Sequence, residues 1–124
     1  MISEGETFLW CGDAQVQHLY IAMNNSGACN QKLALFNLTE SSGGIASFVL
    51  TKNDHPYIYK NSDVNFGDGI YTDDYILEWN VKCGKACPQK NMDIGMVQKI
   101  AEVAVNHPAV SREIKILLRE FWGF

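Results

Sequence analysis

The apolar residues of this chain change their spacing once, near residues 82–88, and that change limits the folds open to it. Before this point, apolar and polar residues alternate in short runs, which is the pattern of half-buried strands. After it, apolar residues recur every three or four positions, as they do on one face of a helix. We therefore expect an α+β fold, with a strand-rich part followed by a helical part.

The strand-rich part spans residues 6–82 and consists of apolar or aromatic runs separated by turn-forming residues. Runs of this kind with short polar connections predict an antiparallel sheet of five to six strands. Tyr57-Ile58-Tyr59 is short enough to be an optional strand, and residues 61–69 are polar and turn-like. The expected strands are residues 7–11, 16–23, 32–38, 45–51, 57–59 and 70–81.

The run from Lys32 to Leu38 is apolar at both odd and even positions. The same is true of the run over residues 45–51. A strand of this type is buried on both faces of its sheet, so these two runs are expected to be central and to pair with each other. Something must then cover the second face. The C-terminal helices are the expected cover.

The helical part, residues 91–122, is expected to form a helical hairpin. Asn91 or Asp93 is a suitable N-cap for a first helix over residues 92–106, and Pro108 suits the first turn of a second helix that Gly123 ends. We expect both helices to pack on the sheet, so that residues 1–124 form a single domain. The apolar stripe of the second helix comprises Val110, Ile114, Leu117, Leu118 and Phe121.

Charge and hydropathy exclude several classes of protein. The formal net charge of the 124 residues is −4, which argues against general nucleic-acid binding. No stretch approaches the roughly 18 apolar residues of a membrane span, and the acidic opening residues do not resemble a signal peptide. The sequence therefore predicts a cytoplasmic protein that does not enter a membrane.

The last helix contains the only two arginines of the chain. On a helix, Arg112, Lys115 and Arg119 share one edge, with Trp122 beside it. Arginine offers a fork of donors that matches phosphate or carboxylate, and an indole can stack on a base. This pattern predicts a site for a small anionic, nucleotide-like ligand. In the alternative interpretation, these charges are solvated or pair with acids of the strand-rich part.

The acidic excess belongs to residues 1–90, which carry ten acids against six lysines. A second functional hypothesis follows from this: an acidic surface that includes Asp68, Asp73 and Asp74 binds a basic, nucleic-acid-binding surface of a partner protein and thereby inhibits it. The segment 63–74 also resembles a calcium loop in part. It lacks the required glycine and glutamate, so an acidic turn is the better interpretation.

Three apolar residues of the last helix and its end lie outside the core stripe. Ile116 falls between the charged edges, and Trp122 and Phe124 are at the terminus. Exposed apolar groups of this kind favour association with a second copy, so we expect a homodimer or another homo-oligomer.

The four cysteines suggest a third hypothesis. Cys83 and Cys87 are spaced closely enough to supply two thiolates to zinc, with ligands from Cys11, Cys29, His18, His55 or His107 completing the site. A thiol-dependent activity at the same pair is the related alternative. The sequence shows no second ligand pair of matching spacing, so free thiols are the default and no cofactor is otherwise indicated.

No sequence motif of a known catalytic type occurs in the chain: there is no glycine-flanked serine, phosphate loop or paired-histidine metal motif. We therefore expect a non-enzymatic binding protein. Small acidic proteins of this composition are common among phage and mobile-element products that sequester or inhibit a target.

Overall fold

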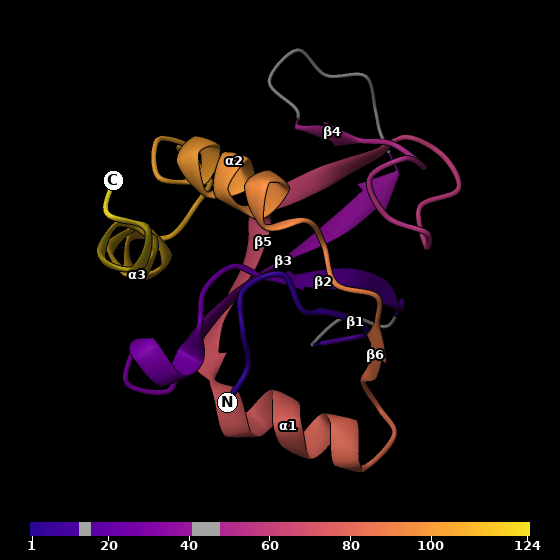
Figure 1. The fold of residues 1–124 in the computed structure, drawn as a ribbon, viewed down its shortest axis with the longest axis horizontal. Helices are drawn as coiled ribbons and strands as arrows, with labels where there is room; N and C mark the ends of the chain where they lie inside the picture. Colours follow the sequence, from indigo (N-terminus) through magenta and orange to yellow (C-terminus); the bar gives the residue numbers. More distant parts are fainter. Residues whose placement is uncertain (13–15, 41–47) are drawn as a thin grey trace.

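The computed structural model describes residues 1–12, 16–40 and 48–124, which form an α+β fold (Figure 1). An antiparallel sheet of six strands lies between helices on its two faces. A short 3-10 turn, η1 (Ser26–Ala28), separates the second and third strands. The strands are β1 (Thr7–Trp10), β2 (His18–Ala22), β3 (Lys32–Glu40), β4 (Val49–Leu50), β5 (Ser62–Asp73) and β6 (Cys87–Gln89). The helices are α1 (Asp74–Lys82), α2 (Ile94–Ala104) and α3 (Arg112–Trp122).

The strand order is β4-β5-β3-β2-β1-β6. The expectation that residues 32–38 pair with residues 45–51 is wrong: β3 lies between β2 and β5, and β4 is the edge strand beyond β5. Length explains the difference, because β5 has 12 residues and can pair along the whole of β3, whereas β4 has two. Residues 45–47 of the expected strand, and most of the turn before it, lie outside the described residues.

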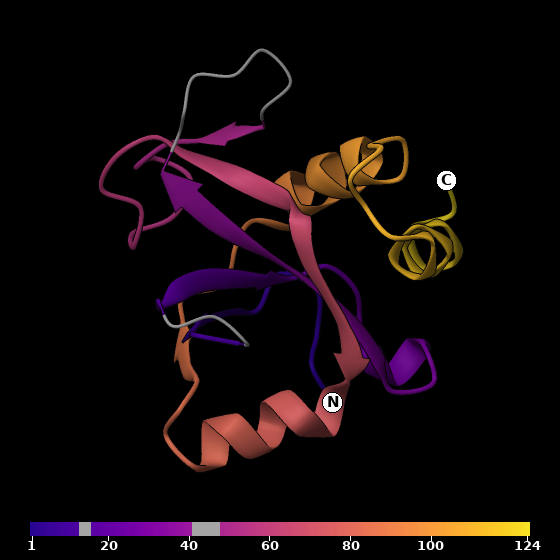
Figure 2. The same cartoon turned by 180° about the vertical axis from the view of Figure 1, so that it is seen from behind.

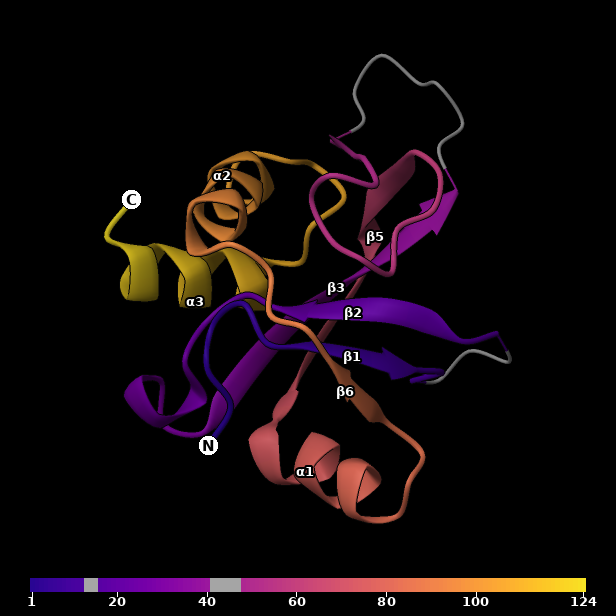
Figure 3. The same cartoon turned by 45° about the vertical axis from the view of Figure 1, so that its right-hand side comes forward.

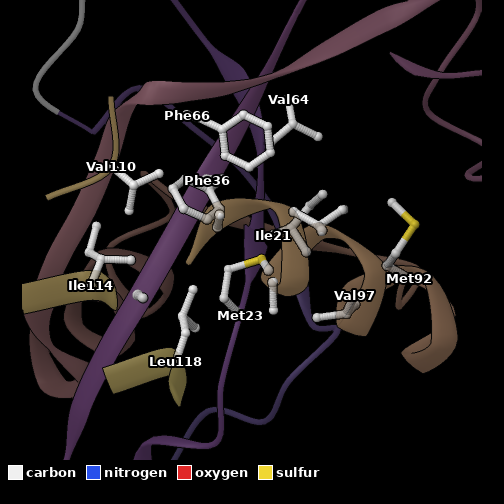
Figure 4. Close-up of a cluster of buried hydrophobic side chains, with 14 of the residues drawn as sticks. Ile21, Met23, Phe36, Val64, Phe66, Met92, Val97, Val110, Ile114 and Leu118 are labelled. Carbon is white, nitrogen blue, oxygen red and sulfur yellow. The ribbon is translucent and has the colours of Figure 1, made fainter. Parts of the chain in front are cut away.

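The larger core lies between the sheet and the helices α2 and α3 (Figure 4). Ile21 of β2, Met23 just after that strand and Phe36 of β3 meet Val97 of α2 and Leu118 of α3 there, and all five are fully buried. Apolar area removed from water stabilises a fold by roughly 25 cal/mol per Å², so this layer supplies a large part of the driving force. It also confirms that α2 and α3 pack on the sheet.

A second, smaller core fills the opposite face of the sheet, where α1 lies (Figures 1 and 2). Leu77 of α1 is fully buried in it with Leu33 and Leu35 of β3. Figure 3 shows α1 on one side of the sheet and α2 and α3 on the other. The prediction that residues 32–38 are covered on both faces is therefore confirmed, although α1 covers the second face instead of the C-terminal helices.

The expected strand over residues 70–81 is wrong beyond Asp73, because residues 74–82 form α1. Leu77 and Val81 fit both the spacing of a strand and the spacing of a helix, since they lie four residues apart. In the structure Leu77 is buried and Val81 packs beside it, whereas Tyr75 and Trp79, which would share their face in the expected strand, are both 64% exposed. Asp74 in the first turn and Lys82 in the last turn also interact favourably with the helix dipole, which stabilises the helix.

Three further local predictions need correction. Residues 57–59 form no strand, and residues 61–69, expected to be turn-like, contribute the first two thirds of β5. The sequence predicted no strand in the segment where the spacing changes. The edge strand β6 begins there and pairs with β1. Its three residues include Pro88, which an edge position tolerates because a proline has no N–H for a further strand.

The ends of α2 and α3 follow from capping residues. Asp93 caps α2 as predicted, since its side chain accepts a hydrogen bond from the Met96 N–H. Pro108 does not lie in the first turn of α3: the helix begins at Arg112, and the Ser111 hydroxyl accepts a hydrogen bond from the Ile114 N–H. Gly123 ends α3 in the left-handed conformation, which is the predicted stop.

Within the described segments, no helix has both the length and the apolar composition needed to cross a bilayer.

Candidate functional site

The pairing of β3 and β5 contains a wide irregularity. Leu35 pairs with Ile70 and Asn37 pairs with Asn65, so four residues of β5, 66–69, stand opposite Phe36 alone. Such a bulge bends a strand strongly, and bulges are over-represented next to functional sites because they redirect side chains. The bend of β5 is visible in Figure 2. It also leaves β3 without regular strand pairing at Phe36, between Leu35 and Asn37.

Packing on the core side holds this bulge in place. The Phe66 ring lies edge-on to Phe36, with centroids 5.2 Å apart, and stacks on His107 at 4.7 Å. Gly69 lies so close to the core that a Cβ atom there would stand 2.7 Å from the Phe36 ring and 2.9 Å from Ile114 Cδ1. The sequence Phe66-Gly67-Asp68-Gly69 is thus anchored at Phe66 and needs a glycine at Gly69.

Asn37 lies at the edge of this bulge, where it pairs with Asn65, and is the unusual residue of β3. It is 3% exposed, and its Nδ2 donates a hydrogen bond to the Tyr20 hydroxyl at 3.3 Å. Its Oδ1 is buried and has no hydrogen-bond partner within the described part of the chain. A buried acceptor without a partner costs roughly 1–3 kcal/mol. A polar group kept at such a cost in a central strand is a candidate for ligand binding.

A pocket of about 410 Å³ opens over Asn37. Asp68 from the bulge is exposed at its edge and accepts a hydrogen bond from Asn65 Nδ2 at 2.9 Å. His18 stands on the other side, with Nδ1 3.2 Å from the Leu38 carbonyl oxygen. Because a carbonyl oxygen only accepts, Nδ1 carries the hydrogen, and Nε2 of the neutral ring is an acceptor. The lining residues are His18, Tyr20, Asn37, Gly67, Asp68, Gly69 and Ile70.

His18 also lines a second pocket, of about 320 Å³, between the start of β2, the end of β3 and the segment 57–60. Two exposed tyrosines, Tyr57 and Tyr59, form one of its walls. Lys60 and Glu40 form an ion pair there, so the lysine charge is already matched by an acid. The hydrogen bond from the ammonium to Glu40 raises the pKa of Lys60 above its usual range. This second pocket is therefore aromatic and close to electrically neutral.

The groups that the first pocket presents are mostly hydrogen-bond acceptors. They are the exposed carboxylate of Asp68 and Nε2 of His18; the Asn37 amide oxygen and the Tyr20 hydroxyl belong to lining residues that are themselves buried. Acceptors gathered around a carboxylate suit a ligand group with several N–H donors and a positive charge, such as a guanidinium or an ammonium. A phosphate or carboxylate would meet repulsion from Asp68 in the same place.

The residues predicted to bind an anion occupy α3, on the opposite side of the sheet from α1, and two of them take part in the fold itself. Arg119 Nη2 donates a hydrogen bond to the carbonyl oxygen of Val105 at 2.9 Å, and Trp122 Nε1 donates to the carbonyl oxygen of Met23 at 2.9 Å. Arg112 is exposed and Lys115 is half-buried. Neither pairs with an acid among the described residues. Of the basic residues predicted to bind an anion, Arg112 and Lys115 are therefore the two without an acidic partner among the described residues.

The three acids of the predicted acidic surface have different environments. Asp73 accepts a hydrogen bond from Lys32 Nζ at 2.5 Å. Asp74 is buried and accepts a hydrogen bond from the Ser26 hydroxyl at 2.7 Å, which joins α1 to η1. Only Asp68 is exposed, and it is the acid that lines the pocket at Asn37.

The cysteines stand apart from these pockets. Cys83 and Cys87 are exposed, Cys11 and Cys29 are half-buried, and all four are free thiols. Among the described residues, no three His, Cys, Asp or Glu side chains come together as a metal site. Cys87 Sγ lies 4.0 Å from the carbonyl oxygen of Gly84, within the turn that follows α1.

Sequence reasoning missed Asn37 as a site residue. A signal was present, because Asn37 is the one polar residue in the apolar run from Leu33 to Leu38. The pair Gly67 and Gly69 around Asp68 was interpreted as an acidic turn, although glycines within a strand pattern also indicate a bulge.

Comparison of the chain with protein-family models, with curated proteins and with solved structures gives no match.

Proposed function

We propose that this protein is a non-enzymatic binding protein that captures a basic side chain of a partner protein in the pocket formed by Asn37, Asp68 and His18. The observation that carries the proposal is the buried, unpartnered Oδ1 of Asn37, a residue that lines a pocket whose other polar side chains are mostly acceptors. A guanidinium group supplies donors to the amide oxygen and the carboxylate together.

The electrostatics of the whole chain support a basic partner. The net charge of −4, with the acidic excess in residues 1–90, attracts a positively charged surface and raises the rate of encounter. Tyr57, in the second pocket that His18 lines, supplies a ring for a further cation, whereas the Tyr59 ring already has Lys60 Nζ over it, 5.4 Å from its centroid. An inhibitor that occupies the nucleic-acid-binding surface of its target, as a phage or mobile-element product does, is one role that this chemistry serves.

The four free thiols support action in a reducing compartment such as the cytoplasm, because cysteines of secreted small domains are usually joined in disulfides.

The test is titration of the ¹⁵N-labelled protein with a short arginine-rich peptide, followed by NMR. We expect the peptide to shift the side-chain amide signals of Asn37 and the backbone signals of Gly67 and Gly69. We also expect the binding to weaken at high salt, because exposed charges are then screened. Free arginine is the smaller second probe. A peptide that leaves these signals in place while the protein stays folded contradicts the proposal.

Two variants separate the pocket from general electrostatic attraction. Asp68→Asn removes one charge at the pocket, and Glu102→Gln removes one charge from an exposed position on α2. Both changes are isosteric, and both side chains are exposed, so neither change is expected to disturb the fold. We expect Asp68→Asn to weaken peptide binding about tenfold or more and Glu102→Gln to weaken it about twofold or less. Equal effects would contradict a specific role for the pocket.

A second candidate function is the capture of a small anionic, nucleotide-like ligand by α3. The observation that favours it is the exposed position of Arg112 and the absence of an acidic partner for Arg112 or Lys115 among the described residues. Arg119 and Trp122 contribute less than the sequence suggested, because a ligand has to compete with their bonds to Val105 and Met23.

A further inference from the structure

The helix α1 exposes an apolar face that the fold itself does not use. Tyr75 and Trp79 are each 64% exposed and Ile76 is 39% exposed, whereas Leu77 on the opposite face is fully buried. Large aromatic side chains gathered on one exposed face commonly mark an interaction surface. The face of α1 formed by Tyr75, Ile76, Glu78, Trp79 and Lys82 is called the α1 face below.

A shallow hollow runs along the α1 face, and its volume is about 640 Å³. On a helix of 3.6 residues per turn, Tyr75, Trp79 and Lys82 fall close to one line along its length. Glu78 lies on one flank of that line and Ile76 on the other. The surface is thus a narrow apolar stripe of the kind that packs against another helix.

The charges along α1 are ordered by sign. Asp73 and Asp74 lie at its N-terminal end, Glu78 lies at its middle, Lys82 is its last residue and Lys85 follows it. Glu78 binds the Met1 ammonium at 2.6 Å through Oε2 only, so a further cation can approach its other oxygen. A second α1 in antiparallel orientation can bring Lys82 of one helix beside Glu78 of the other. This charge order is complementary to itself.

We propose that the α1 face binds the α1 face of a second copy of this chain across a two-fold axis. The two helices run antiparallel, the Trp79 side chains lie beside the axis, and Glu78 of each copy faces Lys82 of the other. A two-fold interface requires a surface that is complementary to itself, and the ordered charges of α1 meet that requirement. Under this symmetry, the flanks of the two copies that carry Glu78 and Lys82 lie on the same side of the helix pair.

The expected area sets the strength of the association. A buried aromatic side chain contributes about 150–250 Å², and Tyr75 and Trp79 are each 64% exposed, so together they can add roughly a third of the about 800 Å² per partner of a standard interface. Tyr71, at the end of β5, is 42% exposed and extends the apolar area. The dimer is therefore weak and depends on protein concentration. Its surface also differs from the one formed by Ile116 and the terminal aromatics of α3.

The first test is sedimentation velocity of the full chain over a range of concentrations. We expect Trp79→Glu to raise the dimer dissociation constant about 30-fold, which is typical of a residue at the centre of an interface. The matched control is Ile116→Glu, because Ile116 is a similarly placed exposed apolar residue on α3, 43% exposed. It is expected to leave association unchanged. A wild-type chain that stays monomeric at high concentration overturns the proposal, as does an Ile116→Glu chain that alone loses the dimer.

The second test exchanges the charges. Glu78→Lys places two lysines opposite each other in the dimer, and Lys82→Glu places two glutamates opposite each other, so each variant alone is expected to be monomeric. In an equimolar mixture each lysine of one variant faces a glutamate of the other, and a heterodimer is expected to form with about the wild-type affinity. A mixture that stays monomeric, or single variants that associate as the wild type does, overturns the antiparallel arrangement. Circular dichroism verifies that both variants stay folded.

Discussion

Arg119 of α3 donates a hydrogen bond from Nη2 to the main-chain carbonyl oxygen of Val105, with the two atoms 2.9 Å apart. Val105 is the C-cap residue of α2, so a positive charge lies where the carbonyl groups of that helix end without partners inside the helix. A cation at this end also interacts favourably with the helix dipole. The contact therefore joins the two helices that cover one face of the sheet.

This relationship predicts different effects for the two arginines. We expect Arg119→Ala to lower the free energy of unfolding by about 1 kcal/mol, since it removes a charge-assisted hydrogen bond at a partly exposed position. Arg112→Ala is the control, because Arg112 is exposed and makes no ion pair within the described residues; its effect is expected to stay within about 0.5 kcal/mol. Urea titration followed by circular dichroism measures both. Equal losses would show that the bond to Val105 contributes no stability.

The two glycines of the β5 bulge form a second matched pair. A Cβ atom at Gly69 would lie 2.7 Å from the Phe36 ring and 2.9 Å from Ile114, both in the buried core, so Gly69→Ala is expected to cost about 1–3 kcal/mol of stability. At Gly67 the nearest atom is Asn65 Oδ1 at 3.7 Å. Gly67→Ala is therefore expected to change stability by less than about 1 kcal/mol and to favour the fold through the entropy of the unfolded chain. Thermal unfolding distinguishes the two, and a Gly69→Ala protein as stable as the wild type would contradict the packing described here.

Much of the fold could be predicted from the sequence because burial on both faces of a sheet leaves a clear pattern. Residues 16–23 were expected to form a strand, and in the structure Leu19, Ile21 and Met23 face the larger core, whereas Tyr20 and Ala22 face the smaller one, which is the alternation of a strand. Both C-terminal helices were also predicted. Their caps at Asp93 and Gly123 act through local hydrogen bonding or backbone conformation, which sequence reasoning can assess.

The parts that could not be predicted depend on contacts between distant residues. Leu77 and Val81 satisfy either a strand or a helix, and only the position of β3 below them decides between the two. The candidate site has the same dependence. Asn37 becomes a buried group without a partner because β5 pairs with β3 and loops out four residues opposite Phe36, and no local pattern specifies that pairing.

The Lys32–Asp73 ion pair predicts a loss of stability at high pH. The hydrogen bond from the ammonium to Asp73 raises the pKa of Lys32 above the ordinary lysine value of 10.5. A group whose pKa is higher in the folded state contributes its full stabilisation below the pKa of the unfolded chain, and that contribution is lost as the pH rises through the folded pKa. The wild type should therefore lose more stability above about pH 10.5 than Lys32→Met does. Urea midpoints at neutral and high pH measure this difference. Parallel losses in the two proteins would show that the pair is not formed in solution.

The two candidate ligand sites carry opposite charges, and this contrast gives the last prediction. If α3 binds a nucleotide-like anion, ATP shifts the backbone NMR signals of Arg112 and Lys115, and the double variant Arg112→Ala with Lys115→Ala abolishes that binding. The binding is expected to vanish at about 0.5 M salt, because exposed charges are screened over a few ångströms under those conditions. The same double variant should bind the arginine-rich peptide as the wild type does, since the pocket at Asn37 is formed by β2, β3 and β5. Asp68→Asn should show the reverse behaviour: peptide binding weakens and ATP binding is retained. A double variant that binds ATP with unchanged affinity would remove the anion site from α3, and a double variant that loses the peptide instead would move the cation site there.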